Sequence, residues 1–213
     1  NELLDYVKNE KIKQVQHAYK GLEDDIRLIG LNKGLNPLEG SAYIKNVILA
    51  DKDFHVVKAQ NSDTKLAMLE LQKAVFGDDF YIGPFKSEVD YASQFLFYKL
   101  PEQSEIAYVA VELDAKFFMA EFEDIHGKTN YNLLNPDFYI IGSSDDSLLY
   151  KTWINNVSKD MLDGNQGISD IEGTRYSYGF IDLGESYIYL AINQELNLLK
   201  EGTLKQLIKL FFT

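Results

Sequence analysis

The side chains that most often carry chemistry in proteins are few and scattered in this sequence. Its three histidines are His17, His55 and His126, and none has a histidine or carboxylate partner at the spacing of a metal-ligand motif. No cysteine is present, which excludes thiol catalysis, thiolate metal sites and disulfides. We therefore expect no resident metal and no cofactor.

Two acidic segments have an ordinary structural interpretation. Residues 163–167 (DGNQG) are similar to a calcium loop but lack its acidic spacing and its closing Glu, so a glycine-rich turn is the better interpretation. Glu23, Asp24 and Asp25 lie on the outer side of a predicted helix, as solvated charges. The sequence has neither a Gly-x-Ser-x-Gly motif nor a phosphate loop. We expect no enzyme in this chain.

The composition indicates a folded, acidic protein. Its 213 residues are 46% hydrophobic and 13% aromatic, which is enough for one or two domains with packed cores. The formal net charge is −12, and the basic residues are scattered rather than clustered. An acidic surface repels phosphate backbones, so we expect no nucleic-acid partner.

A short pattern occurs twice and indicates a duplicated architecture. Residues 53–57 (DFHVV) and 137–141 (DFYII) each enter a strand after a polar turn, and each is followed by a polar run that ends in Asp and opens a helix. The offset of 84 residues (137 − 53) is too long for a solenoid repeat. It is typical of a chain made of two similar modules.

Hydrophobic periodicity predicts the elements of both modules. Residues 3–31 form a long helix whose apolar face has Val15, Ala18, Leu22, Ile26 and Ile29. The first module has strands at 43–49, 54–59, 80–82, 94–100 and 106–113, a helix at 64–76 and a short helix capped by Asp114. The second has strands at 131–134, 138–141, 168–171, 175–181 and 187–193, a helix at 145–162 capped by Asp145, and a closing helix from Glu195.

Short links between strands favour antiparallel neighbours. We therefore predict an α+β fold, in which a long N-terminal helix is followed by two PAS-like modules, each a five-stranded antiparallel sheet with its helices on one face. The predicted divisions are 1–40 for the helix and linker, 41–126 and 127–194 for the modules, and 195–213 for the closing helix.

This order of elements resembles the extracytoplasmic double Cache sensor domains of bacterial receptors. Residues 48–53 (ILADKD) resemble the first hairpin of that family, residues 80–85 (FYIGPF) its short third strand, and residues 107–114 (AYVAVELD) its last strand in the distal module. Residues 187–192 (YIYLAI) resemble the final strand of the proximal module. Together these segments cover nearly the whole chain.

The amino-acid-binding motif of that family is absent. Its members that bind amino acids have an Arg and then Trp-Tyr early in the distal helix, with an Asp in the last distal strand. Here Lys65 stands at the Arg position, the aromatic pair is missing, and the Asp position falls near Ala110. The resemblance therefore does not imply an α-amino-acid ligand.

The resemblance implies a ligand site in the first module, between its sheet and the helix and loop that cover it. Two lysines are candidates for a carboxylate or phosphate group, and two aromatic residues are candidates for apolar walls. The ordinary alternative is that the aromatic residues are core, the lysines are surface, and Asp114 is a helix cap. The candidate residues are Lys65, Met68, Tyr81, Lys86, Phe97, Glu112 and Asp114.

The functional prediction is an extracytoplasmic small-ligand sensor of a bacterial membrane receptor. We expect the chain to be a piece of a longer protein, anchored by flanking membrane helices, with a histidine kinase as output and a diguanylate cyclase or chemotaxis module as alternatives. The ligand is expected to be a small polar or anionic molecule, and the N-terminal helix a possible homodimer contact. The alternatives are a module of the same fold that binds a periplasmic protein through residues 80–98, a trimmed soluble domain, and a soluble cytosolic α+β enzyme, which the lack of any catalytic constellation disfavours.

Overall fold

The computed structural model describes most of the chain. The described residues are 2–32, 42–73, 80–82, 93–100, 105–114, 116–123, 125, 129–149, 151–153, 156–164, 166–184 and 187–196. Within these ranges no helix is long and apolar enough to cross a lipid bilayer. The chain folds as two compact units, one of residues 15–120 and 182–187, and the other of residues 1–14, 121–181 and 188–213.

The N-terminal helix α1 (Glu2–Asn32) confirms the predicted long helix, and it contributes to both units. Its fully buried residues recur every three or four positions, as expected for one face of a helix. Ala18 of the predicted apolar face is only half-buried. Two lysines lie in the buried stripe instead, and the whole stripe is Leu4, Lys8, Lys11, Val15, Tyr19, Leu22, Ile26 and Ile29.

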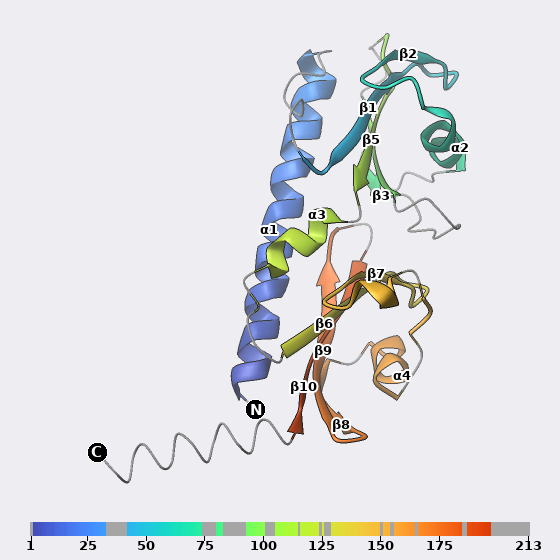
Figure 1. Ribbon diagram of the computed structural model, residues 1–213. Coiled ribbons are helices and arrows are strands. Elements are labelled where there is room, and N and C mark those ends of the chain that lie inside the picture. Colours follow the sequence, from blue (N-terminus) through green and yellow to red (C-terminus); the bar gives the residue numbers. More distant parts are fainter. Residues whose placement is uncertain are drawn as a thin grey trace. The chain divides into compact units, whose positions relative to one another are not determined.

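The first unit contains a five-stranded sheet in the order β2-β1-β5-β4-β3. Its strands are β1 (Ile44–Ala50), β2 (Val56–Ala59), β3 (Phe80–Ile82), β4 (Ser93–Lys99) and β5 (Tyr108–Asp114), and their pairings are antiparallel. The helix α2 (Lys65–Lys73) covers one face, and residues 15–32 of α1 lie along the other (Figure 1). The five antiparallel strands, and the position of α2 between β2 and β3 along the chain, agree with the prediction.

The second unit repeats this topology, with the order β7-β6-β10-β9-β8. Its strands are β6 (Thr129–Leu134), β7 (Ile140–Ser143), β8 (Gly167–Ile171), β9 (Thr174–Asp182) and β10 (Tyr187–Glu195). The helix α4 (Asn156–Leu162) packs on one face. Between the sheets along the chain come α3 (Lys116–Met119) and the 3-10 turn η2 (Ala120–Phe122).

Three predicted boundaries are wrong for identifiable reasons. The strands expected from Phe54 and Phe138 begin two residues later, because both residues have positive φ and belong to the preceding turns. The closing helix was predicted from Glu195, but β10 continues through that residue. Residues beyond 196 lie outside the described chain.

The continuous helix predicted at 145–162 is also wrong. Asp145 does cap a helical turn, since its side chain accepts a hydrogen bond from the Ser147 N–H at 2.9 Å, but the 3-10 turn η3 (Asp146–Leu148) ends at once. Residues 151–153 instead pair with the chain before β7, where the Trp153 N–H donates to the Phe138 carbonyl at 2.8 Å. This extended pairing satisfies backbone groups that a helix would have used internally.

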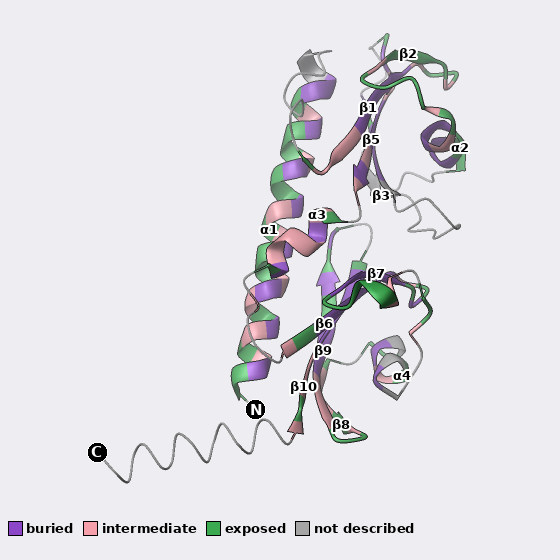
Figure 2. Ribbon diagram, viewed as in Figure 1, coloured by how far each residue is buried: buried purple, intermediate pink, exposed green. Residues whose placement is uncertain are grey.

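Each sheet has its own apolar core on the face that carries its short helix. In the first unit, strand residues pack with Ala67, Met68 and Leu71 of α2. In the second, they pack with Val157 and Met161 of α4. The central strands are buried along most of their length (Figure 2), because both of their faces are covered.

Candidate functional site

The α2 face of the first sheet is closed at its centre by apolar side chains. Side chains alternate between the faces of a strand, so Ile48 of β1, Phe97 of β4 and Ala110 of β5 share this face through their pairings. Met68 of α2 packs against them, and all four are buried. The Phe97 ring is stacked on that of Phe95, with centroids 6.0 Å apart.

The same face becomes polar toward the ends of its strands. Glu112 follows Ala110 by two residues on β5 and lies opposite Asn46 of β1 and Phe95 of β4. Asp114, two residues further along, lies opposite Ser93. Glu112 and Asp114 are both half-buried, whereas Asn46 is only 1% exposed. Here a polar ligand would find oxygen atoms beside the apolar floor.

Asp114 has a structural role at this end of the sheet. One of its carboxylate oxygens accepts a hydrogen bond from the Lys116 N–H at 2.8 Å, at the start of α3. The other lies 3.9 Å from Nζ of Lys45. The interpretation of Asp114 as a helix cap is therefore confirmed, and its carboxylate is already engaged.

Asn46 is the residue of this region that sequence reasoning missed. Its side-chain amide donates to the carbonyls of Asp63 (2.9 Å) and Asn61 (3.3 Å), and its side-chain oxygen accepts from the Asn61 N–H (2.9 Å). Asn61 in turn donates from its side chain to the Lys45 carbonyl. These contacts fix the segment that leads into α2 onto the first strand of the sheet. The sequence shows an Asn inside a run of apolar residues, which marks the position but not its partners.

The predicted site residues are only partly brought together. Met68, Phe97, Glu112 and Asp114 lie on one face of the first unit. Lys65 is exposed at the first turn of α2. The backbone of Tyr81 pairs with that of Phe97 in the sheet. Lys86 lies outside the described residues.

His55 does have carboxylate neighbours, contrary to the sequence analysis. The ligand-type atoms of Asp51, Asp53 and His55 all lie within 4.8 Å of one another. The Asp51 carboxylate is already used by the turn, since one oxygen accepts from the Asp53 and His55 N–H groups, and the other lies 3.3 Å from the His55 ring. These hydrogen bonds, foremost that of the His55 N–H, lower the pKa of Asp51. The geometry is that of a turn.

The segment similar to a calcium loop also closes an element. The Asp163 and Gly164 N–H groups donate to the Lys159 and Met161 carbonyls, and Gly164 has a φ of 74°. This is how an α-helix commonly ends. It supports the interpretation of these residues as a glycine-containing turn.

The corresponding face of the second unit is filled by aromatic side chains. Phe138 and Tyr189 stack with their centroids 4.9 Å apart, and Tyr178 is buried beside them. The Tyr178 hydroxyl donates to the Asp160 carboxylate of α4 at 3.1 Å. Burial, followed by the hydrogen bond and charge of Asp160, raises the pKa of Tyr178. The two modules share a topology but differ in what covers it.

Comparisons with known proteins agree with this architecture. No protein-family model matches the sequence, and no curated protein matches it. An extracellular ligand-binding receptor from Desulfohalobium retbaense is similar in structure, with a TM-score of 0.69 and 13% identity over 87% of this chain. The chain spans 39% of that receptor's length.

Two chemoreceptor domains are similar over almost their whole length. The periplasmic sensory domain of Campylobacter jejuni Tlp1 has a TM-score of 0.67 and 12% identity, over 92% of this chain and 94% of that domain. The ligand-binding domain of Pseudomonas fluorescens CtaA, in complex with L-serine, has a TM-score of 0.62 and 14% identity, over 92% and 99%. The chain therefore has the fold of Cache-type sensor domains, and the predicted resemblance is confirmed at the level of the fold.

Proposed function

We propose that this chain is the extracytoplasmic small-ligand sensor of a bacterial transmembrane receptor. Ligand binding occurs in the first module, within residues 41–126, and the second module, residues 127–194, couples it to the rest of the receptor. The output is a histidine kinase, with a diguanylate cyclase or a chemotaxis module as alternatives. Residues 195–213 lead toward the membrane, and α1 is the contact between two copies.

One observation carries this proposal. On the α2 face of the first sheet, the apolar floor around Phe97 continues directly into a half-buried carboxylate, Glu112. Ligand sites combine an apolar lining with a few polar groups that orient the ligand. On the equivalent face of the second module, the hydroxyl of the buried Tyr178 is already bonded to Asp160 of α4, which supports a coupling role there.

The ligand in this proposal is a small polar molecule. Glu112 is the group expected to accept hydrogen bonds from a ligand amino or hydroxyl group. Lys65 and Lys86 are the groups expected to hold a carboxylate or phosphate, and Lys65 is exposed at the start of α2, where it can reach an entering anion. The proposal differs from the amino-acid mode of binding because the aromatic pair after the Lys65 position is absent.

One observation favours the alternative, a module that binds a periplasmic partner protein. The strand β2 lies at the edge of its sheet, and Val56 and Val57 are exposed on it. An exposed apolar edge strand can pair with an extended segment of another chain. In that case, substitution of Val57 by a charged residue would abolish partner binding and leave small-ligand binding unchanged.

The test is a thermal-shift screen of the chain against organic acids, amines and amino acids, each added singly. A compound that binds only the folded state raises the melting temperature, and saturation at about 100 times Kd corresponds to about 2.7 kcal/mol. Each hit is then titrated by calorimetry against the wild type, Glu112→Gln and the exposed control Glu195→Gln. We expect Glu112→Gln to weaken binding about tenfold or more, the loss of a charge-assisted hydrogen bond. The absence of any hit, or equal affinity of Glu112→Gln and wild type, would overturn the ligand site.

A further inference from the structure

The buried stripe of α1 changes in chemistry along the helix. From Val15 to Ile29 its members are Val15, Tyr19, Leu22, Ile26 and Ile29, all buried within the first unit. In the part that belongs to the second unit, two of its three members are lysines, Lys8 and Lys11, which are 3% and 4% exposed. Lysine is almost never fully buried unless its ammonium group is paired.

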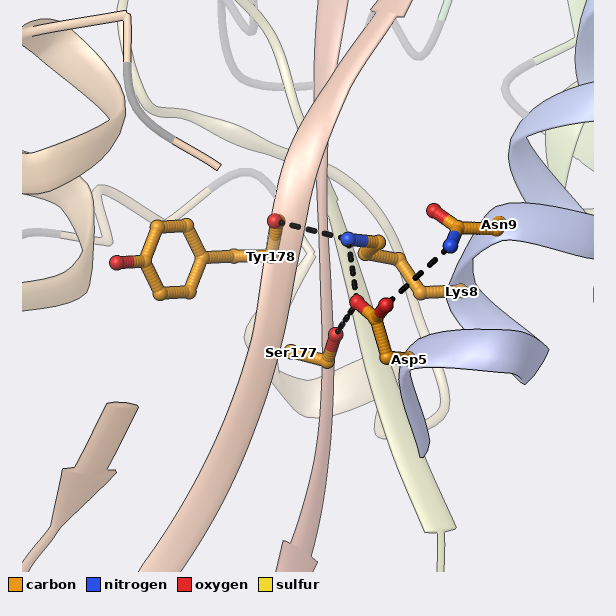
Figure 3. A network of polar contacts seen from close by, with 5 residues as sticks. All are labelled: Asp5, Lys8, Asn9, Ser177 and Tyr178. Carbon is orange, nitrogen blue, oxygen red and sulfur yellow. Dashed lines mark hydrogen bonds and ion pairs between the residues drawn. The ribbon is translucent and has the colours of Figure 1, made fainter. Parts of the chain in front are cut away.

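Lys8 is held by a network that joins α1 to β9. Its Nζ donates to the Asp5 carboxylate at 2.8 Å and lies 3.5 Å from the Tyr178 carbonyl oxygen. The Ser177 hydroxyl donates to the same Asp5 oxygen at 3.0 Å, and the Asn9 side chain donates to the other at 3.4 Å. Figure 3 shows the ammonium group of Lys8 between the helix and the strand, with dashed lines to the Tyr178 carbonyl and the Asp5 carboxylate.

Lys11 is held in the same way, one turn further along α1. Its Nζ donates to the Glu121 carbonyl at 2.7 Å and to the Gln14 side chain at 2.8 Å. It also lies 5.9 Å from the centroid of the buried Phe122 ring. Each lysine therefore contacts a main-chain oxygen of the second unit, that of Tyr178 or Glu121.

The two kinds of attachment differ in how firmly they hold a helix. Aliphatic and aromatic side chains are stabilised by removal from water, in proportion to the area buried. An ammonium group loses its hydration when it is buried. The free energy of its new hydrogen bonds is about equal to the free energy of dehydration. Moreover, a lysine can leave such a site by exchanging each protein oxygen for water. Burial of Lys8 and Lys11 therefore contributes little net free energy to the docking of this part of α1.

We propose that residues 4–11 of α1 form a releasable latch on the second unit, in which Lys8 and Lys11 keep the helix docked but weakly held. The latch has two discrete states, with the ammonium groups either bonded to the Tyr178 and Glu121 carbonyls or hydrated. The segment from Val15 to Ile29 stays attached to the first unit in both states. Two-state elements of this kind can change population in response to a small bias.

The latch does not depend on the proposed sensor function. If the chain is a sensor, release of the latch is a step that could transmit the signal. Its test therefore needs no ligand. Hydrogen exchange of the whole chain, measured residue by residue with NMR, compares two sets of amides on the same helix. We expect the amides of residues 8–12 to exchange about 100-fold faster than those of residues 22–29. Local opening requires less free energy where less apolar area becomes exposed to water.

The matched variants separate the latch from simple fraying of the helix end. In Lys8→Met/Lys11→Met, an unbranched apolar side chain replaces each lysine stem. We expect exchange at residues 8–12 to slow by about tenfold or more. The Asp5 side chain is 39% exposed and keeps Ser177 and water as partners, so the dehydration of the two ammonium groups is the larger effect that the substitution removes. Lys13→Met removes an exposed charge from the same helix and is expected to change nothing, because the Lys13 side chain is 71% exposed.

Two exchange results would overturn the latch. Equal protection of residues 8–12 and 22–29 in the wild type would overturn the latch, and this comparison requires no variant. Unchanged or faster exchange in the double variant would also overturn it, because the lysines would then not be the weak element. If the double variant does not fold, Lys11→Met alone gives the same comparison. A failed ligand screen with the expected exchange pattern would refute the proposed function and leave the latch intact.

Discussion

Phe54 and Phe138 are the same residue of the same turn, 84 positions apart (138 − 54). Both have a left-handed backbone, with φ of 63° and 59°, and both N–H groups donate to the carbonyl three residues earlier, at 3.1 Å and 2.9 Å. Each ring stacks on a tyrosine from the last strand of its own sheet, Tyr108 or Tyr189, with centroids 5.1 Å and 4.9 Å apart. The repeat in the sequence is therefore a repeat in structural detail.

The first residue of each turn accepts two backbone hydrogen bonds, but it is an Asp in one turn and an Asn in the other. Asp51 in the first turn accepts from the Asp53 and His55 N–H groups at 2.9 Å and 2.8 Å. Asn135 in the second accepts from the Asp137 and Tyr139 N–H groups at 3.1 Å and 2.8 Å. Because an uncharged amide forms the same turn, the Asp51 carboxylate needs no metal to account for it. The turn holds the phenylalanine in a conformation that costs a non-glycine residue about 1–2 kcal/mol.

This strain gives a first prediction. Phe54→Gly is expected to be at least as stable as Phe54→Ala, by up to about 1 kcal/mol, because glycine adopts positive φ without a Cβ penalty. At ordinary positions glycine is the less stable of the two. Urea unfolding of both variants measures the difference. A Phe54→Ala variant that is clearly the more stable would show that the backbone at Phe54 is not strained.

The depth of burial distinguishes the two turns. Phe138 is 6% exposed and Phe54 is half-buried, so Phe138→Ala should cost about 3 kcal/mol of unfolding free energy and Phe54→Ala about half of that. The same urea experiment checks the order of the two variants. A larger loss for Phe54→Ala would contradict the assignment of Phe138 to the core.

The presence of five antiparallel strands in each module could be predicted, because periodicity and short links between strands are visible in the sequence. The starts of β2 and β7 could not, since Phe54 and Phe138 look like the first apolar residues of strands while their φ values place them in turns. The interruption of the predicted 145–162 helix after η3 could not be predicted either. The apolar spacing of Leu149, Trp153 and Val157 is compatible with a helix, and only the pairing of Thr152 with Tyr139 prevents it.

Glycines of α1 give a second prediction. A Cβ at Gly21 would have no atom within 4 Å, whereas a Cβ at Gly30 would lie 2.6 Å from Cδ2 of Leu100. Gly21→Ala is expected to raise the free energy of unfolding by about 0.5–1 kcal/mol, the usual gain of alanine over glycine inside a helix. Gly30→Ala has the same helix gain but must displace Leu100, so we expect it to be neutral or destabilising.

Thermal and urea unfolding of the two variants make this a matched comparison on one helix. Equal stabilisation by both substitutions would mean that Leu100 moves away at no cost. A loss of stability in Gly21→Ala would contradict the open surroundings of that position.

The candidate site was less predictable than the fold. The family resemblance suggested Glu112 and Asp114, and the structure places both after Ala110 on one face of β5. Asn46 was missed, since its role depends on carbonyls 15 and 17 residues away, and no local pattern encodes them. Lys65 could be assigned to the start of the helix, but only the structure shows that it faces solvent.

Asn46 gives a third prediction. Asn46→Ala is expected to destabilise the chain by about 2–3 kcal/mol, because the Asn61 N–H and the Asp63 carbonyl lose a buried partner. Asn130, whose side chain accepts a hydrogen bond from Ser144 at an exposed position, is the matched control. Asn130→Ala should change stability by less than about 0.5 kcal/mol. Urea unfolding of the two variants is the measurement, and equal effects would mean that Asn46 does not anchor the entry to α2.

Asp5 gives the last prediction, on pH. The hydrogen bond from Lys8, opposed by burial and assisted by Ser177, lowers the pKa of Asp5 below its ordinary value of 3.8. The folded state therefore binds this proton less readily than the unfolded state. The resulting stabilisation is fully present above the unfolded pKa near 3.8 and is lost as the pH falls through the lower, folded pKa.

Carboxyl NMR titration and pH-dependent unfolding test this together. We expect the pKa of Asp5 to be below 3.8 in the wild type and to rise in Lys8→Met, while Lys13→Met leaves it unchanged. Asp5→Asn should lose stability less steeply than the wild type as the pH falls below about 4, because one linked proton is removed. If Lys8→Met leaves the Asp5 pKa where it was, the hydrogen bond from Ser177 is the main cause instead. Lys8 would then hold the Asp5 carboxylate less firmly than their 2.8 Å contact within α1 indicates.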